Sequence, residues 1–298
     1  MALTTNNNLM AYNATRNLNN HYSNLSTSVR RLSSGLRVDT AADDAAGLAI
    51  RELMRADIAG MKQGIRNAND AISLIQTADG ALQVIDEKLI RMKELAEQAA
   101  TGTYNSTQRL IIDSEYQAMA SEITRIANAT DFNGVKLLDG SLSGSHDGSK
   151  LNASGELKIH FGVGNDSAED YYYIEIGSST ASSLGVGNQS ATGDDVAGFS
   201  ISTQSAAQVA LTAINDAITS KDNIRAALGA LQNRLENTVS NLQIQAENLQ
   251  AAESQISDVD VASEMTTFVK NQILTQSAVA MLSQANSMPQ LAMQLIGG

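Results

Sequence analysis

Apolar residues recur at steps of three or four along the whole stretch from Ile50 to Ala96. This spacing places them on one face of an α-helix, and the stretch is far longer than an ordinary globular helix. Apolar residues off this stripe, among them Leu53, Leu74 and Leu95, indicate burial on a second face, inside a bundle or against another subunit. The pattern predicts one long coiled-coil-like helix.

Two further stripes predict packing partners for this helix. After a polar break at residues 101–107, apolar residues at helical spacing over residues 112–126 predict a shorter return helix that ends in a turn at Gly134. Near the other end of the chain, a second long stripe covers residues 211–256, with a polar interruption at Lys221. The two long helices are natural partners for each other, because most helical stability comes from packing an apolar face.

The segment between the helical halves, residues 135–205, has a different composition, rich in Gly, Ser, Asn and Asp. The runs ELKIHFG (residues 156–162) and DYYYIEIG (residues 170–177) place apolar residues at every second position, which is typical of half-buried strands. The turn sequence VGNDSAED joins them. We therefore expect a small β-hairpin region here.

Both chain ends return to helical spacing, so the predicted fold is mainly α: a long antiparallel coiled-coil-like helical bundle formed by both termini, with a small central β-hairpin region. A lone helix with one apolar stripe is marginal, so each terminal segment is expected to pack on the other or on another copy of the chain. Head-to-tail association that does not close would give a helical filament. The expected assembly interface comprises Leu25, Val29, Leu32, Val279, Leu282, Met288, Leu291 and Leu295.

The stretch RLSSGLRVDTAADDAAGLAI, residues 31–50, contains two adjacent carboxylates, Asp43 and Asp44. Adjacent residues on a helix point about 100° apart, so they do not converge on one chemical site. The spacing from Thr40 to Asp43 matches a capping box, and carboxylates are favoured in the first turn by the helix dipole. We therefore expect the long helix to start here, after a bend at residues 33–35.

The composition excludes several classes of function. Cysteine is absent, which removes disulfides, thiolate metal sites and cysteine nucleophiles, and Pro289 is the only proline. The net charge of -12 argues against nucleic-acid binding, so the cluster Arg30, Arg31 and Arg37 is expected to be a solvated face or an inter-helix ion-pairing site. No secretory signal is expected, because residues 1–20 contain no apolar core, and no membrane-spanning segment is expected, since no window reaches about 18 apolar residues.

The sequence contains no constellation for catalysis. His21, His146 and His160 are scattered, and no HExxH run occurs in the central segment. We expect no enzyme activity, no catalytic residues, no cofactor and no metal site.

Three groups of motifs resemble a known family. The runs RRLSSGLRVDTAADDAAGLAI (30–50), IRNANDAISLIQTADGAL (65–82) and DFNGVKLLDG (131–140) are similar to the N-terminal region of bacterial flagellins. The runs at residues 234–268 and QANSMPQLAMQLI (284–296) resemble the flagellin C-terminal region. This resemblance implies a motility-related structural subunit of the flagellar filament that polymerises through its terminal helices.

The resemblance also implies a division of the chain. The expected parts are an N-terminal inner helical segment (1–42), the long helix and return helix of a rod domain (43–134), a small β or variable region (135–205), the second long rod helix (206–256) and a C-terminal inner helical segment (257–298). It further implies export through the flagellar type III apparatus to an extracellular filament. Implied partners are a chaperone at the C-terminal helix and the filament cap and junction proteins.

A second property implied by the resemblance is recognition by the toll-like receptor that senses flagellin. The segment IRMKELAEQ, residues 90–98, is similar to the recognised surface, with Arg91, Glu94 and Leu95 matching the family pattern and Glu115 on the facing helix. Two positions depart from that pattern, Lys93 and Glu97, and a lysine lacks the bidentate geometry of arginine. The other interpretation is that these residues make subunit contacts only.

Two other functions stay open at this point. A hook-filament junction protein would share the paired terminal helices but would cap the assembly rather than extend it. A secreted binding module or adhesin would instead place its function in residues 135–205, although about 70 residues rich in Gly and Ser offer only a small core.

Overall fold

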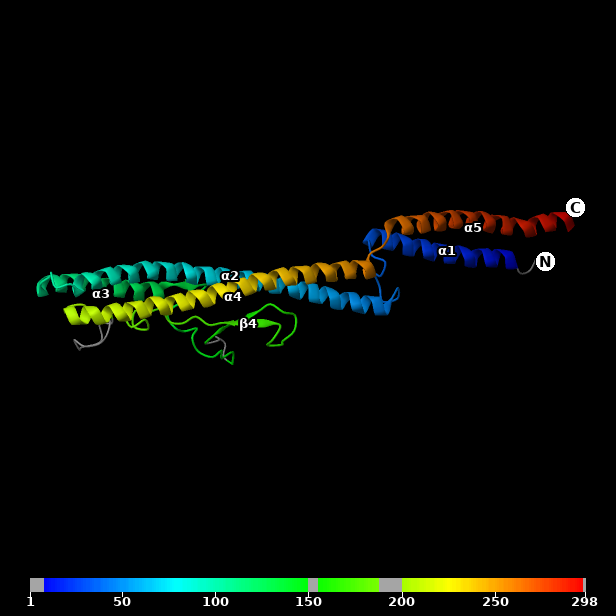
Figure 1. Cartoon of the computed structure of the whole chain (residues 1–298). Helices are drawn as coiled ribbons and strands as arrows, with labels where there is room; N and C mark the ends of the chain where they lie inside the picture. The colour runs from blue at the N-terminus through cyan, green and yellow to red at the C-terminus, as the bar shows by residue number, and fades with distance from the viewer. Residues whose placement is uncertain (1–7, 150–154, 188–199, 297–298) are drawn as a thin grey trace. The chain divides into compact units, whose positions relative to one another are not determined.

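A computed structural model describes residues 8–149, 155–187 and 200–296, with the backbone alone for 291–296. Five long helices dominate these residues, α1 (Leu9–Ser34), α2 (Ala45–Ala100), α3 (Ser106–Ala129), α4 (Gln204–Ser257) and α5 (Val261–Ile296) (Figure 1). The predicted mainly α fold with a central hairpin is confirmed. The chain divides into two compact units, which we call the terminal unit (Met1–Ile58 with Glu247–Gly298) and the central unit (Ala59–Ala246).

In the terminal unit, α1 and α5 lie side by side and antiparallel (Figure 1). The Asn8 amide donates a hydrogen bond of 2.7 Å to the Ala285 carbonyl at one end of the pair, and Arg31 lies 3.8 Å from Glu264 at the other. The least exposed positions of both helices follow an alternating three-and-four spacing, the geometry of a coiled-coil seam. They are Ala11, Ala14, Leu18, His21, Leu25, Ser28 and Leu32 on α1, and Glu264, Phe268, Asn271, Thr275, Ala278, Leu282 and Ala285 on α5.

The bend between α1 and α2 is held by ionic and backbone contacts. Gly35 ends α1 in a left-handed conformation, with φ of 73°. A guanidinium nitrogen of Arg30 donates to both carboxylate oxygens of Asp43, at 3.0 and 3.1 Å, and so joins α1 to the bend. The predicted inter-helix ion pairing of the arginine cluster is confirmed for Arg31, which pairs with Glu264 on α5. An isolated antiparallel bridge pairs Leu36 with Asp258 and ties the two bends together.

The start of α2 differs from the predicted capping box. The helix begins at Ala45, and the Asp44 carboxylate caps it by accepting a hydrogen bond of 2.9 Å from the Gly47 backbone N–H. Thr40 is not the cap, because its hydroxyl and backbone N–H both donate to Asp43. The prediction of a helix start near these residues is therefore correct. Only Asp44 caps the helix, whereas Asp43 accepts hydrogen bonds within the bend.

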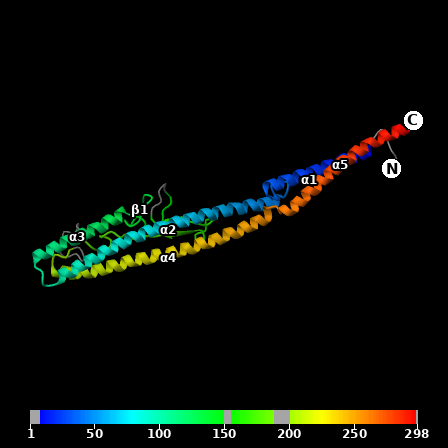
Figure 2. The same cartoon turned by 90° about the horizontal axis from the view of Figure 1, so that it is seen from above.

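In the central unit, α2, α3 and α4 lie alongside one another (Figure 2). The α2 stripe is buried or half-buried from Ala68 to Ala96, as predicted, and the predicted return helix α3 is present. This helix starts with a capping box between Asn105 and Gln108. Of the apolar residues off the α2 stripe, Leu74 and Leu95 are buried, whereas Leu53 is exposed. The predicted second face of α2 is therefore buried over only part of the helix.

Four short strands complete the central unit. The pair β1 (Asp131–Phe132) and β2 (Val135–Lys136) forms a tight hairpin around Asn133 and Gly134, whose φ values of 50° and 81° suit an Asn-Gly turn. The pair β3 (Leu157–His160) and β4 (Tyr171–Ile174) is the hairpin predicted from alternation, with Leu157 opposite Ile174 and His160 opposite Tyr171.

The larger hairpin packs tightly on the helices. The Asn67 amide of α2 donates to the His160 carbonyl at 2.8 Å, and the guanidinium of Arg234 on α4 lies 4.2 Å from the centre of the Tyr172 ring. Gly64 permits this approach, because a side chain there would collide with the Phe161 carbonyl.

Candidate assembly surface

The expected assembly residues fall into three groups. Leu25, Leu32 and Leu282 are half-buried on the seam positions of α1 and α5. Val29 and Val279 are exposed, and Met288 is half-buried beside a groove. The side chains of the remaining two lie outside the described residues; these are Leu291 and Leu295.

The seam between α1 and α5 mixes large apolar side chains with small and polar ones. Nine of its fourteen positions are alanine or polar, including His21, Ser28, Asn271 and Thr275. The five large apolar residues are each only half-buried; they are Leu18, Leu25, Leu32, Phe268 and Leu282. Since hydrophobic stabilisation is roughly proportional to the apolar area removed from water, these residues contribute less than they would in a closed core.

The outer face of the pair also carries large apolar residues. On α5, Val261, Met265, Val269 and Ile273 recur at every fourth position, and each is 43–57% exposed. Contiguous exposed apolar surface on a soluble chain marks a contact surface. Others exposed on the same two helices are Leu9, Met10, Tyr12, Tyr22, Val29, Val279 and Met281. The expected interface residues Val29 and Val279 belong to this exposed set, whereas Val261 and Met265 were not predicted, because α5 is apolar on more than one side.

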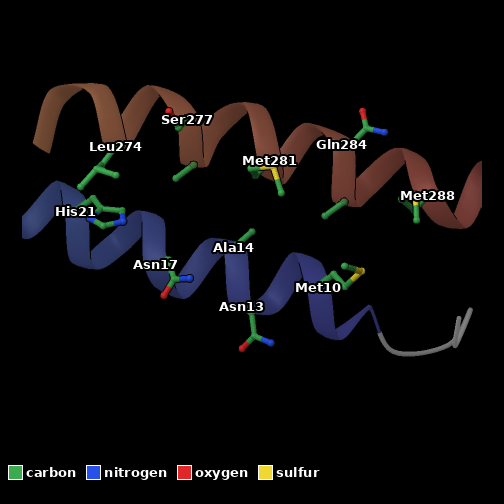
Figure 3. A pocket seen from close by; sticks show the side chains of 12 residues that line it. Met10, Asn13, Ala14, Asn17, His21, Leu274, Ser277, Met281, Gln284 and Met288 are labelled. Carbon is green, nitrogen blue, oxygen red and sulfur yellow. The ribbon is translucent and has the colours of Figure 1, made fainter. Parts of the chain in front are cut away.

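A groove of about 490 Å³ lies between α1 and α5 (Figure 3). Its presence follows from the small seam residues Ala14, Ala278 and Ala285, which leave the helix backbones without large side chains between them. Three methionines line it, Met10 from α1 and Met281 and Met288 from α5. The groove is therefore apolar and sulfur-rich.

The predicted receptor residues separate into a surface cluster and a core residue. Arg91 donates to Glu115 across the two helices at 2.8 and 3.0 Å, and to Glu94 on its own helix at 2.8 Å. All three are exposed, and the hydrogen bonds to Glu94 and Glu115 raise the pKa of Arg91. Leu95 is 2% exposed, because it packs in the core of the central unit, so it lies outside this surface cluster and its part in receptor recognition stays a prediction.

The β region shares the core of the helices. Leu137, Ile174, Ile176 and Val186 pack in one continuous cluster with the buried residues of α2, α3 and α4. A binding module would need a core of its own. The described part of residues 135–205 is therefore an integral piece of the central unit.

The described residues contain no group of three or more His, Asp or Glu side chains arranged to hold a metal ion. No described helix combines the length and the apolar character that a membrane crossing needs.

Comparison with known proteins places this geometry in context. Residues 5–143 match the bacterial flagellin N-terminal helical region, and residues 211–296 match the bacterial flagellin C-terminal helical region. A flagellin of Halalkalibacterium halodurans is 42% identical over 98% of both chains. The flagellar filament core protein flaB2 of Brachyspira hyodysenteriae is 41% identical over 98% of this chain and 99% of its own.

A solved structure with a related fold comes from Vibrio parahaemolyticus and is described as a flagellar hook-associated protein. It has a TM-score of 0.54 and 13% identity, and the match covers 72% of this chain and all of that one. At this identity the likeness concerns the fold alone.

Proposed function

The chain belongs to the bacterial flagellin family, and we propose that it polymerises into the flagellar filament by burying the outer apolar faces of α1 and α5 against neighbouring copies. It is a structural subunit of that filament. The observation that carries the proposed mechanism is the exposed apolar stripe of the terminal pair. Val261, Val269 and Ile273 face outward, while nine of the fourteen seam positions are alanine or polar.

The exposed stripe favours assembly for a physical reason. It keeps an unfavourable contact with water, and the half-buried leucines of the seam leave part of their apolar area uncovered. A second copy that covers this area removes it from water. When the outer face meets a different surface of the next copy, the contact propagates into a helical filament unless its rotation closes.

Seeded growth of the purified chain tests this mechanism. We expect the full chain to extend filament seeds in precipitating salt, with growth followed by light scattering and electron microscopy. A version that lacks residues 1–35 and 262–298 should stay unassembled. Equal growth of both versions would refute a terminal-helix interface.

We also propose a route of export and a set of protein partners for this subunit. The subunit leaves the cell through the flagellar type III apparatus, and a chaperone covers α5 until export. The filament is extracellular, and its cap and junction proteins contact the same terminal helices. The exposed apolar residues of α5 support the chaperone, because such a surface aggregates when it is left uncovered. We propose no enzyme activity.

A hook-filament junction protein is the alternative within the same assembly. Both proteins use paired terminal helices, but a junction protein occurs in few copies and a filament subunit in many. Quantitative mass spectrometry of purified flagella would separate them. A copy number similar to that of the hook-associated proteins would favour the junction role.

We also propose that the Arg91 cluster is recognised by the toll-like receptor that senses flagellin. Arg91, Glu94 and Glu115 form an ordered, exposed charge network that spans α2 and α3. R91A should reduce receptor activation by the monomer. The control is R125A, since Arg125 is an exposed arginine with a comparable pairing to Glu122. Equal activation by both variants would assign the cluster to subunit contacts.

A further inference from the structure

The groove between α1 and α5 brings three methionine side chains together on a surface otherwise lined by alanines, one leucine and polar residues. Met10 lies on α1, and Met281 and Met288 lie two turns apart on α5 (Figure 3). Their side chains occupy the space between the two helices, where alanines leave room. The thioether sulfur is the most readily oxidised side-chain group in this chain, because cysteine is absent.

These sulfurs are also accessible. Met10 is 51% exposed and Met281 is 62% exposed, while Met92 in the core of the central unit is fully buried. Susceptibility of methionine to oxidation follows exposure. An oxidant of the peroxide class therefore reaches the groove long before it reaches the core.

We propose that Met10, Met281 and Met288 form an oxidation site at which peroxide-class oxidants block assembly of the free subunit. The thioether sulfur gives up two electrons and takes one oxygen atom from hydrogen peroxide, which leaves as water. The product is methionine sulfoxide, a polar group in place of an apolar one. The proposal rests on the proposed function, since it requires the terminal helices to be the assembly surface.

Oxidation opposes assembly because the oxidised side chain is costlier to remove from water. A sulfoxide oxygen is a strong hydrogen-bond acceptor, and burying it against a neighbouring copy without a donor costs free energy. The α1–α5 pair itself should persist, because Met10 and Met281 are exposed rather than packed in the seam. In the filament the groove is covered, so the assembled form is protected and the free subunit is the sensitive form.

The test exposes the full chain to hydrogen peroxide before seeding. Peptide mass spectrometry should find sulfoxide at Met10 and Met281 well before Met92. Circular dichroism should show unchanged helicity, and seeded elongation should fall by about tenfold or more, which corresponds to about 1.4 kcal/mol per contact. Treatment with methionine sulfoxide reductases A and B should restore growth.

Matched variants assign the effect to the groove. M10L/M281L/M288L keeps apolar side chains of similar volume and helix propensity, so its growth rate should be the same before and after peroxide treatment. M265L removes an exposed methionine of α5 outside the groove, so its growth should still fall after treatment, relative to untreated M265L. The proposal is overturned if oxidised parent grows normally, or if the triple variant loses growth as the parent does. Failure of the untreated parent to grow would instead refute the proposed function.

Discussion

The ammonium group of Lys221 on α4 lies 2.5 Å from a carboxylate oxygen of Asp86 on α2, and Lys221 is only 1% exposed. One heptad earlier on α2, Asp79 pairs with Arg225 at 2.7 Å. Both pairs fit a single antiparallel register of the two helices. A slip of one turn would place the buried ammonium beside Leu82 or Leu89, so the pair penalises the wrong register.

The first prediction concerns the two carboxylates next to Lys221. D86N should destabilise the central unit by about 1.5–3 kcal/mol, because a charge-assisted bond to a buried cation is lost. D222N is the control: Asp222 contacts the same ammonium at 2.8 Å, but its side chain is 60% exposed, so its loss should matter little. Urea unfolding measures both. Equal effects of the two variants would contradict a special role for Asp86.

The second prediction compares two glycines of α2. G64A should destabilise the chain by about 1–3 kcal/mol, since the new methyl group would overlap the Phe161 carbonyl and displace the hairpin. G80A meets no atom within 4 Å, so it should stabilise by about 0.4–1 kcal/mol. Thermal unfolding reports both signs. A stabilising G64A would mean that the hairpin does not rest on α2 in solution.

Periodicity was sufficient to predict the helices, because their apolar stripes are long and each turn repeats the same signal. Alternation likewise predicted β3 and β4. The β1–β2 hairpin was not predicted, since strands of two residues are too short to show an alternation of apolar and polar positions. Only its Asn133-Gly134 turn was visible in the sequence.

The contacts that the sequence did not reveal are long-range ones. In the sequence, Lys221 is visible only as a polar interruption of an apolar stripe, because its ion-pair partner Asp86 is 135 residues away. Thr40 has the spacing of a helix cap, but Arg30 from α1 and Thr40 together engage Asp43 and leave the cap to Asp44. Leu95 matched a surface motif, yet packing of the central unit buries it.

The third prediction concerns acid sensitivity at the bend. The Thr40 hydroxyl, followed by Arg30 and Arg31, lowers the pKa of Asp43 from its ordinary value of 3.8. A lowered folded-state pKa means that the stabilisation is present above pH 3.8 and is lost as the pH falls through the lower folded value. The difference in unfolding midpoint between parent and D43N should therefore shrink below pH 3.8. A difference that stays constant with pH would contradict this assignment.

Seeded elongation by I273E tests most directly whether the outer face of α5 is the assembly contact. Ile273 is 57% exposed in the subunit, so a glutamate there should leave the fold intact. Q272E is the matched control, because it adds a glutamate one residue away on a different side of the helix. We expect Q272E to extend filament seeds like the parent and I273E to be slowed by about tenfold or more, since its charge must be buried at the contact. Elongation of I273E at the rate of Q272E would contradict assembly through this face.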